Sequence, residues 1–363
     1  MIKGSFLSER CSDHWGGGFN SNPLQRYLCL GAYPLRRPLL TLTSKGIYCT
    51  EGDFYIDPWA SVPCAVITHA HSDHARSGSS HYIASSPSIP LLRKRLGEDI
   101  HVQGLAYGET IERGSTKISL HPAGHILGSA QVRVECHGEV WVVTGDYKRN
   151  YDPTCRPFEV VPCDTLITEA TFGLPIYKWA PTELVAQEIY DWWMTERDQG
   201  RNALLACYAL GKAQRILAEL SHLTDEPVYV HGATEVLCSI YRDAGIRMVS
   251  TLKAGDDKIK GALVLAPPSG FQSPWAKRFG EASFGFASGW MALRGARKNR
   301  GYDRGFVISD HADWEGLLQT VAQCGARNIL VTHGYVDELA KYLSELGYNA
   351  QALRTEYQGE GDA

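Results

Sequence analysis

Three histidines and one aspartate fall within the six positions from His69 to His74, directly after the apolar run from Cys64 to Ile67. An apolar run of this kind is typical of a buried strand, so the strand would deliver four potential metal ligands into one loop. Because histidines can hold one ion while the Asp-His pair holds another, the segment favours a site with two divalent metal ions and a bridging water. Such a site is typical of hydrolysis.

The alternative is that these histidines are ordinary surface or hydrogen-bonded core residues. The whole chain has only 13 His among 363 residues, and three of them lie in this one stretch. Ligand-type residues rarely cluster this tightly without a metal, so we favour the metal site.

Composition sets limits on the class of protein. The chain has 363 residues, enough for two domains and a large core, and its 44% hydrophobic and 21% charged residues are typical of a soluble globular protein. A net charge of -4 argues against a uniformly basic nucleic-acid surface, so any polyanion site must be a local patch.

The ten Cys form no CxxC pair, which argues against a zinc ribbon or a disulfide scaffold and favours a reduced cytoplasm. We find no membrane-spanning run and no signal-peptide core, and expect a cytoplasmic protein without a membrane partner.

The pattern of predicted secondary structure changes along the chain. Residues 1–38 are aperiodic and contain Gly and Ser, so we expect an N-terminal extension without packed structure. Short strands dominate up to about residue 175, and strand and helix then alternate. Since ligand-type residues reappear at Asp310, His311 and His333, we expect an inserted α/β domain at 176–304 that divides a domain made of 39–175 and 305–363.

The expected elements follow from apolar periodicity. In the first block we predict a helix at 86–96 and strands at 40–48, 52–56, 65–68, 117–121, 131–136, 140–144 and 165–168. In the second block and beyond it we predict strands at 203–206, 228–230, 262–265, 284–287 and 304–308. The helices there are predicted at 181–197, 212–223, 234–243, 314–324 and 336–346.

Four further segments supply residues of the ligand type. His125 lies in a Gly-flanked turn between two predicted strands, whereas Asp57, Asp146 and His333 each follow a strand. Taken singly, each is compatible with a turn former or a packed histidine. In this order, they indicate several loops that converge on metal.

The order of these motifs resembles the metallo-β-lactamase superfamily, in which His-x-His-x-Asp-His is followed by a Gly-flanked His and a strand-terminal Asp. Segments 167–173, 307–313 and 331–334 resemble the three additional motifs of the β-CASP nucleases, whose inserted domain divides the metal-binding one. The resemblance implies a metallo-β-lactamase αββα sandwich with an inserted α/β β-CASP domain.

The resemblance also implies roles for single residues. One zinc ion would be held by His69, His71 and His125, and the other by Asp73, His74 and His333. Asp146 would bridge both ions, and Asp57 would orient the ligands and the water. Asp73 and Asp57 would thereby serve catalysis, while Glu169 and His311 would handle the leaving-group proton. Ala170 stands where family members more often have Ser, which removes one hydroxyl near Glu169.

Other segments, at 52–59, 145–149, 208–215 and 286–291, resemble the bacterial ligase-associated DNA exonuclease group, and the likeness extends over about residues 39–359. This group membership implies a DNA exonuclease of DNA repair that digests single-stranded DNA from the 5′ end. It implies two divalent ions, zinc in preference to manganese, and a DNA ligase and a helicase as partners.

Metals alone do not select the bond that is cut, because two ions can serve a β-lactam, a thioester or a phosphodiester. The predicted insert offers phosphate-binding chemistry at Lys212, which opens a helix, and at Ser269, in a Pro-Pro-Ser-Gly turn. A basic run follows, with Arg294, Arg297, Lys298, Arg300 and Arg304. Such a run is often a solvated face, but beside a phosphodiesterase-type site we expect it to track a nucleic-acid backbone.

Three alternatives stay open. A β-CASP ribonuclease that processes RNA would have the same architecture. A catalytically silent nucleic-acid-binding scaffold is a different class, and the filled ligand positions argue against it. A small-molecule hydrolase would leave Glu169, His311 and the insert without a role.

Overall fold

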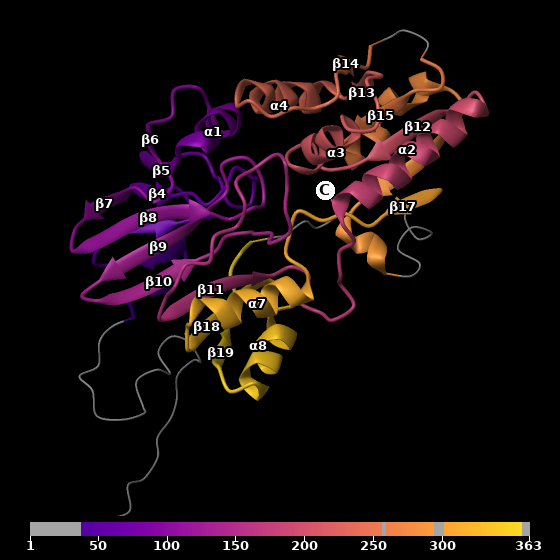
Figure 1. Cartoon of the computed structure of the whole chain (residues 1–363). Coiled ribbons are helices and arrows are strands. Elements are labelled where there is room, and N and C mark those ends of the chain that lie inside the picture. Colours follow the sequence, from indigo (N-terminus) through magenta and orange to yellow (C-terminus); the bar gives the residue numbers. More distant parts are fainter. Residues whose placement is uncertain (1–37, 256–258, 294–300, 358–363) are drawn as a thin grey trace, which may run out of the picture.

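The computed structural model describes residues 38–255, 259–293 and 301–357, which form three β-sheets with flanking helices (Figure 1). The predicted extension at 1–38 lies, except for Pro38, outside the described residues. In the described part of the chain, none of the helices has the length and apolar character needed to cross a membrane.

The first sheet has six strands in sequential order. They are β1 (Leu40–Thr43), β2 (Gly46–Cys49), β3 (Phe54–Ile56), β4 (Cys64–Val66), β5 (His81–Ser85) and β6 (Val102–Leu105). The short helix η2 (Ser86–Ser88) and helix α1 (Ile89–Leu96) follow β5. The single strand predicted at 40–48 is wrong: β1 and β2 form an antiparallel hairpin. The Thr43 side chain makes the turn, because its Oγ1 donates to the Gly46 carbonyl at 2.9 Å and accepts from the Lys45 N–H at 3.1 Å.

The second sheet has seven strands in the order β19-β18-β11-β10-β9-β8-β7. They are β7 (Thr110–Arg113), β8 (Thr116–Pro122), β9 (Ala130–Cys136), β10 (Glu139–Val143), β11 (Thr165–Ala170), β18 (Asn328–Gly334) and β19 (Asn349–Ala352). Helices α7 (Trp314–Cys324) and α8 (Val336–Glu345) pack on this sheet through a shared core. The strands β11 and β18 are parallel neighbours although more than a hundred residues of chain separate them.

The main core lies between these two sheets, because one buried cluster takes side chains from both. Phe54 and Val66 come from the first sheet, and Val134 and Ile167 come from the second. Helix α1 packs on the first sheet in a separate cluster. The layers therefore run helix, sheet, sheet, helix, which confirms the predicted αββα sandwich.

The third sheet is formed by the chain between β11 and β18, in the order β14-β13-β15-β12-β16-β17, and its neighbouring strands are parallel throughout the described residues. Its strands are β12 (Asn202–Ala206), β13 (Val228–Val230), β14 (Thr251–Lys253), β15 (Leu263–Ala266), β16 (Ala282–Ala287) and β17 (Arg304–Phe306). Its helices are α2 (Thr182–Asp198), α3 (Lys212–Leu220), α4 (Gly232–Asp243), α5 (Pro268–Phe271), η3 (Pro274–Phe279) and η4 (Gly289–Ala292). Two buried clusters cover its two faces, which explains the continuous apolar runs of β12 and β15.

The inserted α/β unit of the predicted fold class is therefore present. Its limits at residues 176 and 304 stay a prediction.

Candidate metal centre

The predicted ligands lie in loops and strand ends that meet at one place. The loop with His69 and His74 follows β4, and Asp57 follows β3. His125 lies between β8 and β9, and Asp146 follows β10. The C-terminal part of the chain adds His311, which follows β17, and His333, which lies within β18.

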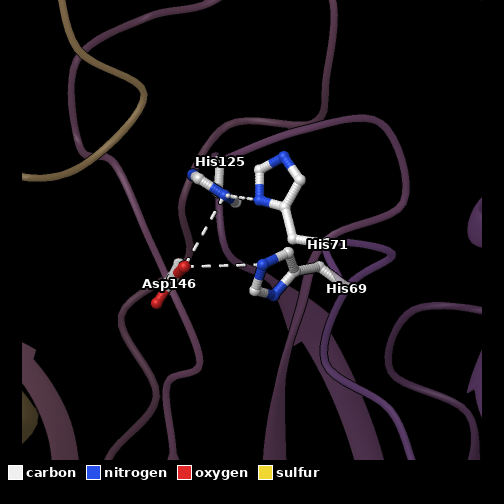
Figure 2. Close-up of side chains that lie close together, drawn as sticks. All are labelled: His69, His71, His125 and Asp146. Carbon is white, nitrogen blue, oxygen red and sulfur yellow. Dashed lines mark hydrogen bonds and ion pairs between the residues drawn. The ribbon is translucent and has the colours of Figure 1, made fainter. Parts of the chain in front are cut away.

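His69, His71, His125 and Asp146 form what we term the first ligand group (Figure 2). One potential ligand atom from each lies within 4.8 Å of the others. Asp146 Oδ2 is 3.4 Å from His69 Nε2 and 3.9 Å from His125 Nε2. The His125 Nε2 and His71 Nδ1 atoms are 3.0 Å apart. Three imidazoles and one carboxylate thus converge on one small volume.

Hydrogen bonds to oxygen acceptors orient the three rings of this group. His71 Nε2 lies 3.3 Å from the Leu210 carbonyl, and His125 Nδ1 lies 2.8 Å from the Asp310 carbonyl. Because a carbonyl can only accept, each of these nitrogens carries the proton, and the other ring nitrogen keeps its lone pair. His69 Nδ1 is held in the same way, 3.0 Å from the Thr68 hydroxyl. The lone pairs that remain are those that face the group.

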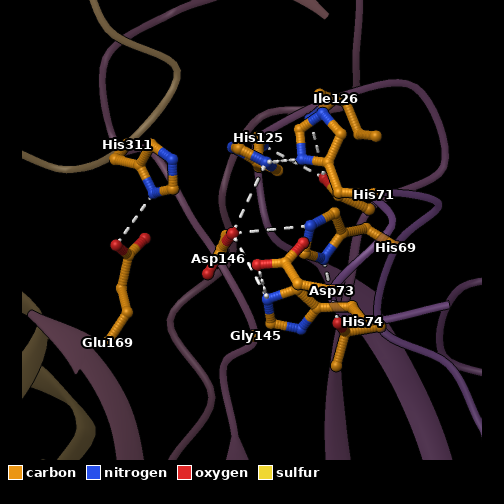
Figure 3. Close-up of polar contacts among 12 residues, drawn as sticks. His69, His71, Asp73, His74, His125, Ile126, Gly145, Asp146, Glu169 and His311 are labelled. Carbon is orange, nitrogen blue, oxygen red and sulfur yellow. Dashed lines mark hydrogen bonds and ion pairs between the residues drawn. The ribbon is translucent and has the colours of Figure 1, made fainter. Parts of the chain in front are cut away.

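Asp73, His74 and His333 form what we term the second ligand group. His74 Nε2 lies 3.7 Å from Asp73 Oδ2 and 3.5 Å from Asp146 Oδ2, so Asp146 lies between the two groups (Figure 3). His333 has a φ of 61°, a left-handed conformation that is rare for a residue with a side chain. Such strain is often found where function requires one orientation.

Asp57 is a buried carboxylate behind the second ligand group. Its Oδ2 accepts from His74 Nδ1 at 2.8 Å and from the Thr68 hydroxyl at 2.5 Å, and its Oδ1 accepts from the Thr68 N–H at 2.7 Å. The backbone of Asp57 is also left-handed, with a φ of 43°. Asp57 therefore fixes the proton of His74 on Nδ1 and leaves Nε2 available to the group.

Tyr357 is a contact of this site that no motif indicated. Its ring stacks on His74 with centroids 4.6 Å apart and planes at 15°, and its hydroxyl donates to the Asp57 carbonyl at 3.2 Å. The residue lies after β19, in a polar stretch without periodicity. Only the tertiary structure brings it to the site.

Glu169 and His311 form a buried pair beside Asp146, and the three make a further convergent group. His311 Nδ1 donates to Glu169 Oε2 at 2.9 Å (Figure 3), and Glu169 Oε1 accepts from the Tyr147 N–H at 2.7 Å. The Thr171 hydroxyl also donates to Oε2 of Glu169. Thr171 thus supplies a hydroxyl to Glu169 although position 170 is Ala.

Several known proteins are similar to this chain in sequence. No protein-family model matches the chain. The chain is 31% identical over 321 residues, or 87% of its length, to a probable DNA ligase from Opitutus terrae. It is 33% identical over 118 residues to the endoribonuclease YSH1 of Eremothecium gossypii, and 25% identical over 212 residues to an RNase J-like protein of Methanocaldococcus jannaschii. The chain belongs to the β-CASP family of the metallo-β-lactamase superfamily.

The relatives are longer than the matched region. The matches span 31%, 15% and 50% of the lengths of these three proteins. A solved structure of a protein of unknown function from Enterococcus faecalis V583 superposes with a TM-score of 0.53. It covers 81% of this chain and 79% of that one at 13% sequence identity, so it supports the fold alone.

Burial and charge affect the two ligand groups of this β-CASP protein differently. Burial, with neighbouring imidazoles, holds the pKa of His69 and His125 well below the usual range of histidine. Burial would also lower the pKa of His74, but the carboxylates of Asp146, Asp73 and Asp57 raise it to about 10. Burial would raise the pKa of Asp73, but His74 and its neighbours lower it to about 2. His69 and His125 of the first group therefore favour the neutral form, whereas the second group is an ion-paired cluster.

The β-CASP site fits divalent metal on the evidence of its unpaired atoms. Buried atoms without a hydrogen-bond partner among the described residues include His69 Nε2, His74 Nε2, Asp146 Oδ1 and both ring nitrogens of His333. A buried polar atom that lacks a partner costs about 1–3 kcal/mol. Imidazole nitrogens and carboxylate oxygens in convergent sets are the ligands that zinc and similar ions take. The clusters are thus able to bind divalent metal.

The residues predicted to bind phosphate, Lys212 and Ser269, differ in their exposure. Lys212 is fully buried, with its Nζ 3.5 Å from Asp310 Oδ2, and so makes an internal ion pair. The Gly211 N–H at the start of α3 is capped by the Gln214 side chain at 2.7 Å. Ser269 is exposed in the four-residue helix α5. Phosphate binding by Lys212 and Ser269 stays a prediction, and the geometry of Lys212 favours a structural role.

Most of the predicted basic run lies outside the described residues, namely Arg294, Arg297, Lys298 and Arg300. Its fifth member, Arg304, is exposed at the start of β17, with its guanidinium carbon 5.8 Å from the centre of the Phe306 ring.

Proposed function

We propose that this protein is a two-zinc phosphodiesterase that acts as a DNA exonuclease in DNA repair and degrades single-stranded DNA from its 5′ end. One observation carries the proposal. Two ligand groups flank Asp146, and a buried carboxylate–imidazole pair, Glu169 with His311, lies beside the same residue. A lactamase-type or thioesterase-type hydrolase would need no such pair.

The ligand groups would hold the ions. His69, His71 and His125 would hold one, Asp73, His74 and His333 the other, and Asp146 would contact both. When bound, two divalent ions would supply Lewis acidity toward a phosphodiester. Manganese would suit the same ligands less well than zinc, because imidazole nitrogens outnumber carboxylate oxygens in the set. Asp57 would keep the His74 ring in its tautomer throughout.

His311 would act on the leaving group. Its Nδ1–H donates to Glu169, so Nε2 is the atom that can pass a proton to the departing 3′ oxygen. Burial would raise the pKa of Glu169, but His311 and the donors Thr171 and Tyr147 hold it below the usual value. Glu169 therefore stays ionised, which stabilises a protonated His311.

The likeness to named relatives supports a nucleic-acid substrate. The relative from Opitutus terrae is named a probable DNA ligase and matches 87% of this chain, which favours DNA and action beside a DNA ligase. A helicase partner rests on the resemblance to the ligase-associated group alone. The endoribonuclease and RNase names of other relatives favour the second candidate, a β-CASP ribonuclease that processes RNA.

One experiment separates these candidates. Matched DNA and RNA strands, single- and double-stranded and labelled at either end, are incubated with zinc- or manganese-loaded protein, and products are resolved by size. We expect short products released from the 5′ end of single-stranded DNA. Preferred digestion of RNA would overturn the DNA assignment, and release from the 3′ end would overturn the polarity.

A catalytically silent scaffold is tested by metal content. If the purified protein takes up neither zinc nor manganese while it still binds a DNA strand, the scaffold replaces the nuclease. We expect two ions per chain.

A further inference from the structure

The segment from Tyr208 to Arg215 follows β12 and includes the first four residues of α3. It therefore belongs to the unit of the third sheet and not to the sandwich that carries the candidate metal ligands. It nevertheless contacts the first ligand group directly. The Leu210 carbonyl accepts from His71 Nε2–H at 3.3 Å. This bond leaves the lone pair of His71 on Nδ1, which is the nitrogen that lies 3.0 Å from His125 Nε2.

Arg215, at the end of the same segment, is a buried cation with only 3% of its surface exposed. Its NH1 donates to the Ser309 carbonyl at 2.5 Å and lies 3.5 Å from Asp310 Oδ1. Its Nε lies 3.3 Å from Asp152 Oδ2, and its NH2 donates to the Thr182 hydroxyl. The guanidinium therefore ties the third-sheet unit to two separate loops near the metal centre.

Lys212 holds the same loop from a second side. Its Nζ lies 3.5 Å from Asp310 Oδ2 and 4.8 Å from the centre of the Tyr208 ring. Both oxygens of the buried Asp310 carboxylate thus face cations of the Tyr208–Arg215 segment. A buried carboxylate needs such partners, because removal of its charge from water is otherwise unfavourable by several kcal/mol.

The loop that these cations hold is part of the reactive site. The Asp310 carbonyl accepts from His125 Nδ1–H at 2.8 Å, and the Ser309 hydroxyl accepts from the His311 N–H at 3.1 Å. A shift of this loop would therefore release the His125 ring and displace the His311 backbone together.

Gly211 shows how closely the segment approaches the ligands. Its φ is +91°, and a Cβ added there would lie 2.5 Å from Cγ2 of Ile126, the residue after His125. Only glycine fits both the backbone conformation and the space. The close approach brings the neighbouring Leu210 carbonyl within reach of His71.

We propose that the Tyr208–Arg215 segment is a positioning element of the metal centre: it orients His71 through the Leu210 carbonyl, and it orients His125 through Asp310, which Arg215 and Lys212 hold. Two of the three histidines of the first ligand group then depend on the third-sheet unit for their tautomer and direction. The inference rests on the metal-binding part of the proposed function and not on the cleavage of DNA.

The test measures metal affinity in place of activity. Zinc affinity is determined by chelator competition for wild type, Arg215→Gln, Arg215→Lys and a control, Arg197→Gln, with circular dichroism as a check on folding. Arg197 forms an exposed ion pair with Glu226 in the same unit, and this pair involves no member of either ligand group. Loss of partners behind a ligand lowers metal affinity by about 10–100-fold. We expect that loss for Arg215→Gln, a smaller one for Arg215→Lys, which keeps the charge without the planar fork, and none for the control.

A folded Arg215→Gln protein with wild-type zinc affinity would overturn the inference. If that variant does not fold, because Asp152 and Asp310 lose a buried cation, Lys212→Met is decisive. It keeps the volume of the side chain and leaves Arg215 in place, so a drop in zinc affinity supports the proposal and an unchanged affinity overturns it.

The outcomes also separate the inference from the proposed function. Wild-type protein that binds zinc but cleaves neither DNA nor RNA would defeat the nuclease proposal, and the affinities of the variants would still decide the inference. Wild-type protein that binds no divalent ion would defeat both.

Discussion

The two ligand groups are held by different chemistry. Backbone carbonyls from distant segments fix His71 and His125 of the first group, and burial with neighbouring imidazoles favours the neutral form of His125. In the second group, the carboxylate of Asp57 fixes His74, and further carboxylates raise the pKa of that ring to about 10. His333, of the same group, has no hydrogen-bond partner on either ring nitrogen among the described residues.

This difference indicates unequal binding of the two ions. A metal entering the first group meets neutral imidazoles in their final orientation, so little reorganisation opposes it. A metal entering the second group must displace a proton from the His74 ring, and this opposes binding. We expect the first group to bind its ion more tightly, and a chelator to remove the ion of the second group first.

Asp146→Ala should have the strongest effect and should weaken both ligand groups together, because Asp146 contacts His69 and His74. Both ions would lose a ligand, and since metal stabilisation of the reacting group is worth several kcal/mol, nuclease activity should fall on the order of a thousandfold. Bound metal per chain and product release from labelled DNA measure the two losses. The control is Asp337→Ala, at an exposed ion pair with Arg354. Retained activity in a folded Asp146→Ala protein would contradict the assignment of this site.

His311→Ala should separate chemistry from metal binding. The ring donates to Glu169 and is not needed by either ligand group, so both ions should stay bound. Loss of a general acid lowers a rate by about 10²- to 10⁴-fold, and we expect kcat to fall within that range while KM changes little. Single-turnover cleavage beside a metal assay measures both quantities. Loss of an ion from the His311→Ala protein would instead show that His311 is a ligand.

Asp57→Asn should weaken the second group more than the first, because Asp57 contacts His74 directly but reaches His69 only through the Thr68 hydroxyl. The carboxylate accepts from both His74 and Thr68, and an amide cannot replace both of its oxygens as acceptors. We expect affinity for the second ion to fall by about 10–100-fold and affinity for the first to fall less. Zinc titration against two chelators of different strength resolves the two steps.

Asp53→Asn is the matched control for this change, since Asp53 also has a left-handed backbone, with a φ of 49°, but is exposed in the turn before β3. An equal loss of both ions in Asp57→Asn would contradict the separation of the two groups.

The sequence indicated most of the candidate ligands that the structure brings together, because they lie in short motifs at strand ends. The His69–His74 loop needs only one strand to bring its ligands together, and the order of motifs placed His311 and His333. Long-range partners carry no such signal: Tyr357 meets Asp57 from 300 positions away, and Arg215 meets Asp310 from 95. Each is a polar residue of a type that is common on surfaces.

Lys212 shows what local sequence chemistry leaves out, namely its buried ion pair with Asp310. A Gly-Lys pair at the start of a helix is typical of an anion site, and the sequence alone contains no sign that Asp310 would fill that role. The β1–β2 hairpin was missed for a related reason. Its turn at Ser44 and Lys45 lies inside an alternating run that is typical of one strand, and a threonine side chain makes the bend.

The smallest effect is expected for Tyr357→Ala and concerns the second group. The ring stacks on His74 and its hydroxyl supports the Asp57 backbone, so its loss should let both side chains move. Ring stacking and a hydrogen bond are each worth about 0.7 kcal/mol, and their sum of about 1.4 kcal/mol corresponds to a fall of about tenfold in affinity for the second ion. Tyr357→Phe should show only part of this loss, because the stack remains. Tyr342→Ala, on the exposed side of α8, serves as the control. If Tyr357→Ala binds the second ion as tightly as wild type does, Asp57 alone is sufficient to hold His74 and Tyr357 has no role in metal binding.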